Sequence, residues 1–276
     1  MSSAKTWLIT GVSRGLGEAL AKAVLAQGDT VIGTTRDKAP DFARDNANFH
    51  WLALDVTDAA AIKPTVDRAF ALKGKIDVLV NNAGYGLLGS VEEATDEQVA
   101  HLFDVNFHGT RRVTQAALPH LRQQRSGHII NITSIAGIAP NPGSGMYSAA
   151  KFAVEGMSQG LAQELAPLGI YLTLVEPGAF RTDFLSDHSL RRSPPAIADY
   201  ADTAGAVVAK LDDIAGKQLG DPERAAEAMI AIVQAATPPL HLLLGSDALR
   251  RTEQMQAAFK QDIEQWREVT LSTDYR

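Results

Sequence analysis

The residues with the clearest capacity for chemistry are Tyr147 and Lys151. A free tyrosine has a pKa of about 10, too high for an efficient proton carrier at neutral pH. Because four residues separate the pair, a helix would place both side chains on one face. We expect the ammonium to favour the phenolate, and lowering the pKa by about 3 units would take about 4 kcal/mol. The pair therefore predicts acid–base catalysis.

A glycine-rich turn follows the first apolar run of the chain. Glycine permits positive φ, a missing side chain lets a pyrophosphate approach the backbone, and the next helix offers free N–H groups. The glycine spacing differs from the common Gly-x-Gly-x-x-Gly pattern, and a plain structural turn is the alternative. The strand–turn–helix context favours a nucleotide site. The expected contacts are Gly11, Ser13, Arg14, Gly15, Leu16 and Gly17.

Two arginines close to this turn predict NADP(H) rather than NAD(H). An NAD site usually places a carboxylate about 20 residues past the turn, to bind the ribose 2′-hydroxyl. This chain has Thr35 and Arg36 there, and Arg14 lies within the turn itself. Two guanidinium groups suit a 2′-phosphate. Asp37 is expected to point away, and a solvated surface charge is the alternative for Arg36.

Asp55 and Val56 follow the third apolar run. A carboxylate at the end of a parallel strand lies at the ligand edge of the sheet, where it could accept a hydrogen bond from an adenine amine. A turn or helix-capping aspartate is equally common at such a position.

Short apolar runs alternate with longer amphipathic stretches, and these elements must position the residues above. The runs lack clean alternation, as expected for a sheet buried on both faces. Strands separated by helices predict an α/β fold with a doubly wound parallel sheet. The expected strands are Trp7–Thr10, Thr30–Thr35, Phe49–Leu54, Ile76–Val80, His128–Ile132, Ile170–Val175 and Leu240–Leu244. The expected helices are Gly15–Gln27, Ala59–Leu72, Asp96–Gln124, Tyr147–Ala166, Pro222–Ala235 and Ala248–Thr270.

The composition bounds the remaining possibilities. The 276 residues suit one domain over residues 1–276, and 45% hydrophobic with 21% charged residues is ordinary for a globular protein. A net charge of −6 without a basic block argues against nucleic acid or an anionic membrane as a partner. No signal peptide or membrane-spanning run is recognised, so we expect a cytoplasmic protein. The absence of cysteine and the scattered histidines predict no metal site.

Further motifs follow in a fixed order: Asn81-Asn82-Ala83-Gly84, Asn106, Ser134, Tyr147 with Lys151, and Pro177-Gly178-Ala179-Phe180-Arg181-Thr182. With these motifs the chain resembles the principal single-domain branch of the short-chain dehydrogenase/reductase family, over about residues 5–245. The resemblance implies a Rossmann-like fold of about seven parallel strands, assembled as a homodimer or homotetramer. It also implies a hydride transfer between NADP(H) and a small carbonyl or alcohol substrate.

The resemblance assigns roles to matching positions. It implies that Asn82 and Ala83 lie beside the adenosine ribose and that Thr182 contacts the nicotinamide amide. The implied catalytic set is Asn106, Ser134, Tyr147 and Lys151. Further expected cofactor contacts are Gly84, Tyr147, Lys151, Pro177, Gly178 and Phe180.

Ser134 and Asn106 have chemical roles that suit this set. The Ser134 hydroxyl could donate to the substrate oxygen, and Thr133 is the competing choice. Asn106 interrupts an apolar helical stretch, where asparagine is mildly unfavourable. It could anchor a water that relays protons to Lys151, or it could be a buried asparagine that satisfies backbone groups.

Two segments fall outside the regular alternation. Residues 183–220, with Pro194-Pro195 and an alanine-rich helical piece, are expected to form an insertion that covers the substrate. Residues 246–276 form an amphipathic tail, expected to be a packed helix or a subunit contact. The expected substrate surroundings are Tyr85, Gly86, residues 135–146, Phe180, Phe184, Leu185 and Leu190.

The sequence thus predicts an NADP(H)-dependent oxidoreductase that interconverts a moderately apolar secondary alcohol and a ketone or aldehyde, with Tyr147 as general acid and base. One alternative is a non-catalytic NADPH sensor with the same fold, which would have little use for Tyr147 and Lys151 together. Another is an epimerase or dehydratase, which would usually carry a larger substrate domain. Fold and motif do not identify the substrate.

Overall fold

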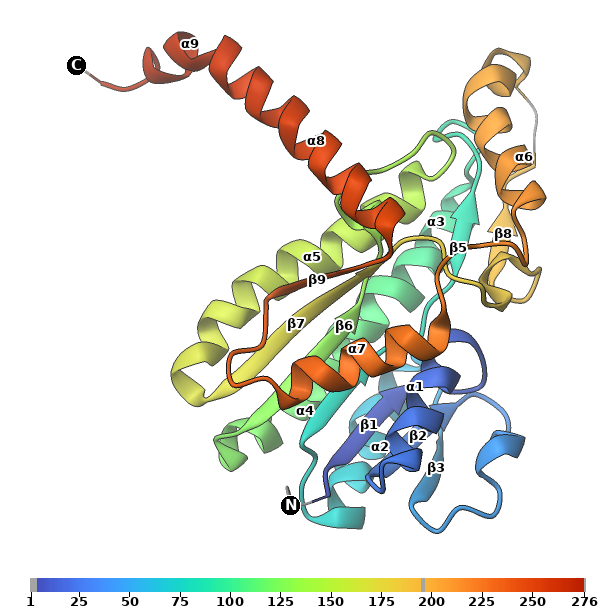
Figure 1. Cartoon of the computed structure of the whole chain (residues 1–276), viewed down its shortest axis with the longest axis vertical. Coiled ribbons are helices and arrows are strands. Elements are labelled where there is room, and N and C mark those ends of the chain that lie inside the picture. Colours follow the sequence, from blue (N-terminus) through green and yellow to red (C-terminus); the bar gives the residue numbers. More distant parts are fainter. Residues whose placement is uncertain (1–3, 195–196, 276) are drawn as a thin grey trace.

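A central sheet of seven parallel strands organises the chain in the computed structural model, which describes residues 4–194 and 197–275 (Figure 1). The strand order is β3-β2-β1-β4-β6-β7-β9. The strands are β1 (Thr6–Thr10), β2 (Thr30–Thr35), β3 (Phe49–Ala53), β4 (Val78–Asn81), β6 (Gly127–Ile132), β7 (Ile170–Pro177) and β9 (His241–Leu244). The expected doubly wound α/β sheet is confirmed.

Successive side chains of a strand point to opposite faces of the sheet, so both faces of this sheet carry apolar residues that helices cover. On β1, Trp7 and Ile9 join the core that contains α1 (Gly15–Ala26) and α7 (Pro222–Gln234). Leu8 points the other way. It joins the core beneath the helices α2 (Ala59–Lys73), α4 (Thr110–Gln124) and α5 (Gly145–Leu165).

The strand order reverses at β1, which pairs with β2 on one side and β4 on the other. In a parallel sheet the helices that follow two such strands lie on opposite faces, which leaves a crevice at the carboxyl ends of the strands. The glycine-rich turn after β1 and the asparagines after β4 therefore lie at the same edge of the sheet.

The helix expected over Asp96–Gln124 is not continuous. It comprises α3 (Asp96–Phe103), a π-helical segment η2 (Asp104–Gly109) and α4. Asn106 lies within the π-helical segment. Its side chain reaches the backbone of Tyr85, and its carbonyl accepts a hydrogen bond from the Thr110 hydroxyl at 3.1 Å. Because π-helical turns often occur at functional sites, this interruption draws attention to Asn106.

A second sheet, which the sequence did not predict, joins β5 (Gly86–Leu88) to β8 (Leu190–Arg192). Three residues per strand are too few for a readable pattern. The stretch 183–220 also contains α6 (Ala206–Asp213), beside β8 in Figure 1; Pro195 of the expected Pro-Pro pair lies outside the described residues. The short helical turns of the chain are η1 (Asp41–Ala43), η3 (Ile135–Gly137), η4 (Ala166–Leu168), η5 (Asp183–Leu185), η6 (Ala198–Tyr200) and η7 (Ala201–Gly205).

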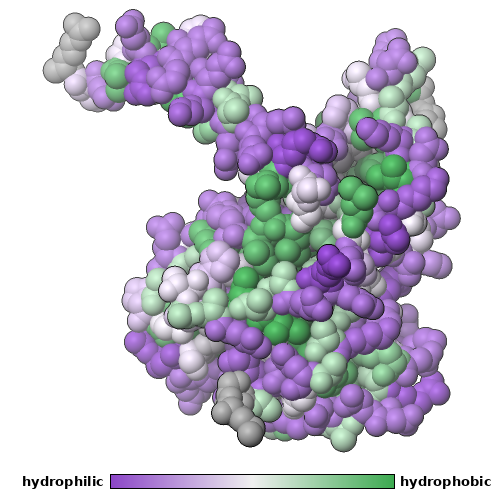
Figure 2. Space-filling model, in the orientation of Figure 1, coloured by the Kyte–Doolittle hydropathy of each residue, from purple (hydrophilic) through white to green (hydrophobic). Residues whose placement is uncertain are grey.

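The C-terminal helix leaves the body of the protein. The helix α8 (Ser246–Gln265) packs only at its root, where Ala248 and Met255 join a cluster with the loop after β6. Residues 256–275, which include α9 (Arg267–Leu271), are exposed and form an arm (Figure 1). Figure 2 shows hydrophobic residues gathered beneath the root of α8 and mostly hydrophilic residues along the arm. Among the described helices, none has the length and apolar character that crossing a bilayer requires.

His128 gives the fold a defined acid sensitivity. It is buried on β6, and burial lowers its pKa to about 4. The Thr173 hydroxyl donates to the Pro239 carbonyl at 2.6 Å, so its oxygen accepts from His128 Nε2 at 2.8 Å. The neutral imidazole fits this arrangement. The unfolded chain binds the proton more tightly, so stability falls as pH decreases from about 6.5 to about 4.

We therefore expect His128 to account for a loss of about 3 kcal/mol in the free energy of unfolding between these pH values. His128→Gln keeps a donor for Thr173 and should remove most of this loss. Urea denaturation at pH 4, 5, 6.5 and 8 measures the difference. His188→Gln, at an exposed histidine, is the control. An equal acid sensitivity in His128→Gln and the parent would contradict the assignment.

Candidate active site

A cavity of about 420 Å³ opens at the carboxyl ends of the strands, where their order reverses. It extends from the glycine-rich turn to Tyr147 and the segment after Asp183. The predicted site residues that line it are Gly11, Ser13, Arg14, Gly15, Leu16, Arg36, Asp55, Val56, Asn82, Ala83, Gly84, Ser134, Tyr147, Lys151, Pro177, Gly178, Phe180 and Thr182. Gly17 and Asn106 lie behind its wall.

The glycine-rich turn has the backbone that its sequence requires. Gly11 and Gly15 have φ of 72° and 62°, in the left-handed region that favours glycine. Gly17 serves close packing instead. A Cβ there would come within 2.3 Å of Asn82 Nδ2 and 2.4 Å of the Gly11 carbonyl oxygen. The turn can therefore hold its shape only while position 17 lacks a side chain.

Asn82, which directly follows β4, stabilises this turn. Its side-chain amide donates to the carbonyls of Thr10 at 3.0 Å and Gly11 at 2.8 Å. In return, the Thr10 hydroxyl accepts from the backbone N–H groups of Asn82 and Ala83 at 3.0 and 3.1 Å. The first N–H groups of α1 have no partner within the helix and face this edge. The arrangement fits the phosphates of a dinucleotide.

The residues expected around the adenosine lie at the same end of the cavity. Arg14 and Arg36 both line it, whereas Asp37 is outside the set of lining residues. Asp55 accepts hydrogen bonds from the backbone N–H and hydroxyl of Thr57 at 2.9 and 2.8 Å. These bonds agree with the interpretation of Asp55 as a turn residue, and Asp55 also lines the cavity.

Tyr147, Ser134 and Lys151 converge at the opposite end of the cavity. Both Tyr147 and Lys151 are buried on α5, with Lys151 Nζ 5.7 Å from the centre of the Tyr147 ring. Lys151 donates to the Ile132 carbonyl at 3.0 Å. Ser134 lies two residues after the end of β6, and its Oγ accepts from the Ala136 N–H at 3.0 Å while it also hydrogen-bonds to the Tyr147 side chain. A substrate oxygen here would meet two hydroxyl groups.

The groups of the chain do not by themselves lower the pKa of Tyr147, and the expected lowering depended also on the positive charge of oxidised nicotinamide. Burial raises the pKa of Tyr147 to about 12, and the hydrogen bond with Ser134 acts in the opposite direction with a smaller effect. Burial also lowers the pKa of Lys151 to about 8, although the neighbouring Glu155 carboxylate favours the ammonium. At both residues the cost of burying a charge is the larger effect.

Asn106 matches the alternative interpretation given above. Its Oδ1 accepts from the Tyr85 N–H at 3.0 Å, and its Nδ2 donates to the Tyr85 carbonyl at 2.7 Å. The side chain therefore satisfies backbone groups and fixes Tyr85, which lines the cavity. Gly84 separates Asn106 from Lys151, since a Cβ on Gly84 would be 3.1 Å from Asn106 Oδ1 and 3.7 Å from Lys151 Nζ.

The sequence reasoning missed Asp247 and Arg251, which line the cavity from the root of α8. Asp247 accepts from the Ala179 N–H at 2.9 Å and lies against Gly178, where a Cβ would meet its Oδ1 at 2.2 Å. Arg251 donates to the Ala139 carbonyl. The sequence did indicate the need for a residue such as Asp247, because the backbone N–H groups of the Pro-Gly segment require a hydrogen-bond acceptor.

The residues expected around the substrate lie at the cavity. Its lining includes Tyr85, Gly86, Phe180, Phe184, Leu185 and Leu190. The loop after β6 contributes Ile135, Ala136, Asn141 and Ser144, and α6 adds Val207 and Leu211. Most of this surface is apolar, with Arg191 stacked on the Tyr85 ring at 4.9 Å.

Comparison with known proteins decides the family. The family model for short chain dehydrogenase matches residues 5–192. The chain belongs to the short-chain dehydrogenase/reductase family. This dehydrogenase is 36% identical over 238 residues to a 3-ketodihydrosphingosine reductase of Bacteroides thetaiotaomicron, covering 86% of this chain and 87% of the relative.

Solved structures agree with this placement. A short-chain dehydrogenase from Streptomyces avermitilis superposes with a TM-score of 0.91 at 38% identity, covering 98% of this chain and 100% of that one. The structure of ElxO with NADP bound has a TM-score of 0.74 at 26% identity, covering 90% of this chain and 99% of that one. This dehydrogenase is therefore an oxidoreductase that uses a nicotinamide cofactor.

The packing of Gly17 against Asn82 predicts a loss of cofactor binding on Gly17→Ala. The new Cβ would overlap Asn82 Nδ2 and displace that side chain, so we expect the Kd for NADPH to rise at least about tenfold. Fluorescence titration with NADPH measures this Kd. Gly160→Ala is the control, because no described atom lies within 4 Å of its added Cβ and alanine favours the helix by about 1 kcal/mol. Unchanged binding in Gly17→Ala would contradict the packing argument.

Proposed function

We propose that this dehydrogenase interconverts a secondary alcohol and a ketone or aldehyde with NADP(H), using Tyr147 as the proton donor and acceptor. The observation that carries the proposal is the convergence of Tyr147, Ser134 and Lys151 in a cavity that begins at the glycine-rich turn. Such an arrangement places a reacting carbonyl between a hydride carrier and a proton donor.

Reduction of the carbonyl requires a proton at the oxygen. The pKa of Tyr147, which burial raises to about 12, keeps its phenol protonated at neutral pH. The phenol can then donate to the oxygen as negative charge develops there, and the Ser134 hydroxyl can donate a second hydrogen bond. The reduced cofactor supplies the hydride when bound.

Oxidation of the alcohol requires the reverse proton movement, with the Tyr147 phenolate as acceptor. Lys151 favours that phenolate only while it remains an ammonium. Because burial lowers the pKa of Lys151 to about 8, its charge is retained below this pH and lost above it. Lys151 is also placed to hold the nicotinamide ribose hydroxyls at the cavity wall.

The substrate that suits the cavity is a moderately apolar ketone or the matching alcohol. The surface beyond Tyr147 is built from Phe184, Leu185, Leu190 and Leu211. The ring of Phe184 lies 6.1 Å from that of Tyr147 and would contact the group next to the carbonyl. The relative named as a reductase of 3-ketodihydrosphingosine supports a ketone as the reacting group.

Tyr147→Phe tests the catalytic assignment. We expect it to retain cofactor binding and to lose about 10³-fold or more in kcat for carbonyl reduction, since only the donor proton is removed. NADPH oxidation over a panel of apolar ketones measures turnover. Tyr171→Phe, at a half-exposed tyrosine on β7, is the matched control and should be unaffected. Near-normal turnover in Tyr147→Phe would refute the assignment, and binding without turnover in the parent would favour a sensing role.

Arg14 and Arg36 predict the cofactor preference. Each charge-assisted contact with a 2′-phosphate contributes about 1.5–3 kcal/mol, so Arg36→Gln should raise the KM for NADPH about tenfold or more and leave that for NADH nearly unchanged. Arg44→Gln is the control, because Arg44 forms an exposed ion pair with Asp41. Comparable kcat/KM values for NADH and NADPH in the parent would overturn the preference.

A further inference from the structure

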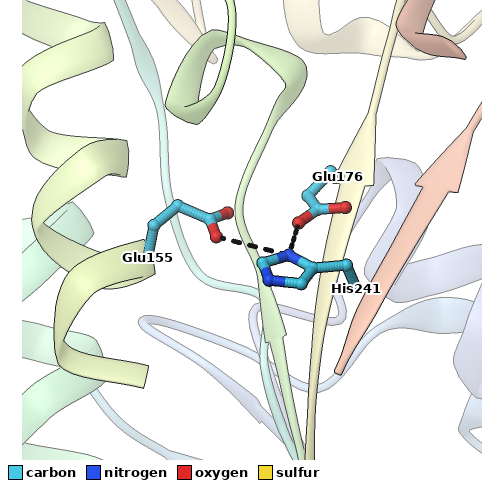
Figure 3. A group of neighbouring side chains, drawn as sticks. All are labelled: Glu155, Glu176 and His241. Atoms are coloured by element: carbon cyan, nitrogen blue, oxygen red, sulfur yellow. Dashed lines mark hydrogen bonds and ion pairs between the residues drawn. The ribbon is translucent and has the colours of Figure 1, made fainter. Parts of the chain in front are cut away.

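Two buried carboxyl groups and a histidine lie behind the catalytic pair (Figure 3). Glu155 is on α5, four residues after Lys151, and is 3% exposed; Glu176 is on β7 and is fully buried. His241 is on β9, and its side chain is 44% exposed. The three come from separate elements, so no local pattern of the sequence brings them together.

His241 connects the two carboxyl groups. Its Nδ1 lies 2.5 Å from Glu176 Oε1 and 3.9 Å from Glu155 Oε2. The second oxygen of Glu176 and Oε2 of Glu155 are buried without a hydrogen-bond partner among the described residues. The imidazole is thus the only group of the three that meets solvent.

Glu155 accepts a hydrogen bond from Thr133. The Thr133 hydroxyl donates to Glu155 Oε1 at 2.6 Å, and the Val175 carbonyl accepts from the Thr133 N–H at 2.8 Å. Burial nevertheless has the larger effect and raises the pKa of Glu155 to about 7, with the bond from Thr133 acting in the opposite direction.

Glu155 lies one helical turn after Lys151 on α5. Residues four apart on a helix share a face. The backbone of Gly137 packs against both, since a Cβ there would be 3.1 Å from Glu155 Cγ and 3.3 Å from Lys151 Cβ. The Glu155 carboxylate raises the pKa of Lys151 against the effect of burial. The charged groups that face Glu155 are Lys151 on α5, Glu176 on β7 and His241 on β9.

A metal ion fits this cluster less well than a proton does. Two ligands on a tetrahedral zinc ion, each about 2.0–2.1 Å from it, lie about 3.3 Å apart. The 2.5 Å separation of His241 Nδ1 and Glu176 Oε1 is shorter than this and matches a charge-assisted hydrogen bond. Glu155 Oε1 is also engaged with Thr133.

We propose that Glu155 is a positioning residue that holds Lys151 in its ammonium form at alkaline pH, and that His241 and Glu176 set the ionisation of Glu155. This inference rests on the proposed function of the Tyr147–Lys151 pair. When Glu155 loses its proton to solvent, its negative charge balances the buried ammonium. When Glu155 is protonated, Lys151 lacks this counter-charge but is itself protonated, because the pH is then below the pKa of both groups.

Glu155→Gln tests the proposal through the pH profile of kcat/KM for oxidation of the alcohol, the direction in which Lys151 must stabilise the Tyr147 phenolate. Without the carboxylate, Lys151 should lose its proton at lower pH, so the alkaline limb should move down by about one pH unit. Activity should be near normal at pH 6 and about tenfold lower at pH 9. Glu176→Gln is the matched control. It neutralises the other carboxyl, still accepts from His241, and should leave the alkaline limb in place.

Several outcomes would overturn the proposal. A uniform loss of activity at every pH in Glu155→Gln would show a structural role only, and an equal shift in Glu176→Gln would remove the specific link to Lys151. If Glu155→Gln does not fold, Glu155→Asp replaces it. The shorter side chain holds its carboxylate farther from Lys151, so the limb should move in the same direction by a smaller amount, and an unmoved limb would refute the idea.

Two further measurements separate this proposal from the proposed function. The free energy of unfolding of the parent relative to that of Glu155→Gln should fall as pH rises from about 4.5 to about 7, because burial raises the pKa of Glu155 and the contribution of His128 is common to both proteins. This readout needs no turnover, so it can fail while Tyr147→Phe still behaves as expected. Stabilisation by ZnCl₂ in the parent that His241→Gln abolishes would instead establish a metal site and overturn the proposal.

Discussion

The burial of the Lys151 ammonium is the constraint on which the site depends. A charge removed from water must be compensated by nearby polar groups. The compensation comes from the Ile132 carbonyl at 3.0 Å and from the Glu155 carboxyl one helical turn away. The Ile132 carbonyl reaches Lys151 only because the end of β6 lies against α5, whereas Glu155 is on α5 itself. The catalytic geometry is therefore a consequence of how the helix packs on the sheet.

The same packing explains why the tyrosine is a better donor than acceptor in this structure. Burial penalises the phenolate of Tyr147 as it penalises the ammonium of Lys151, so both groups favour their neutral forms. The hydrogen bond with Ser134 opposes this effect at Tyr147, and the Glu155 carboxylate opposes it at Lys151. Glu155 thereby links the acidic cluster behind α5 to the ammonium beside Tyr147.

Most of the fold could be predicted from local patterns of the sequence. Each strand of the large sheet is an apolar run of four or more residues flanked by turn or helix signals, and all seven were predicted to within about two residues. The glycine positions likewise reflect a backbone that only glycine adopts easily, as the positive φ of Gly11 and Gly15 shows. These features depend on residues close in the chain.

What could not be predicted depends on residues far apart. The pairing of Gly86 with Leu190 joins strands too short to show a period, and the π-helical segment follows from a tertiary contact between Asn106 and Tyr85. The cluster of Glu155, Glu176 and His241 needs three elements to meet. Asp247 binds Ala179 across 68 positions of sequence. In each case the two interacting residues are distant in the chain and come together only when the sheet is assembled.

The contact between Asp247 and Ala179 has a consequence for synthesis of the chain. A ribosome releases the glycine-rich turn early, while β9 and the root of α8 emerge near the end. The segment from Pro177 to Ala179 pairs with Leu244 and is held by Asp247, so it acquires its shape only after those residues appear. A nascent chain thus contains the whole glycine-rich turn long before the cavity wall from Pro177 to Ala179 can form. The protein becomes a functional enzyme only when its last strand docks on the edge of the sheet.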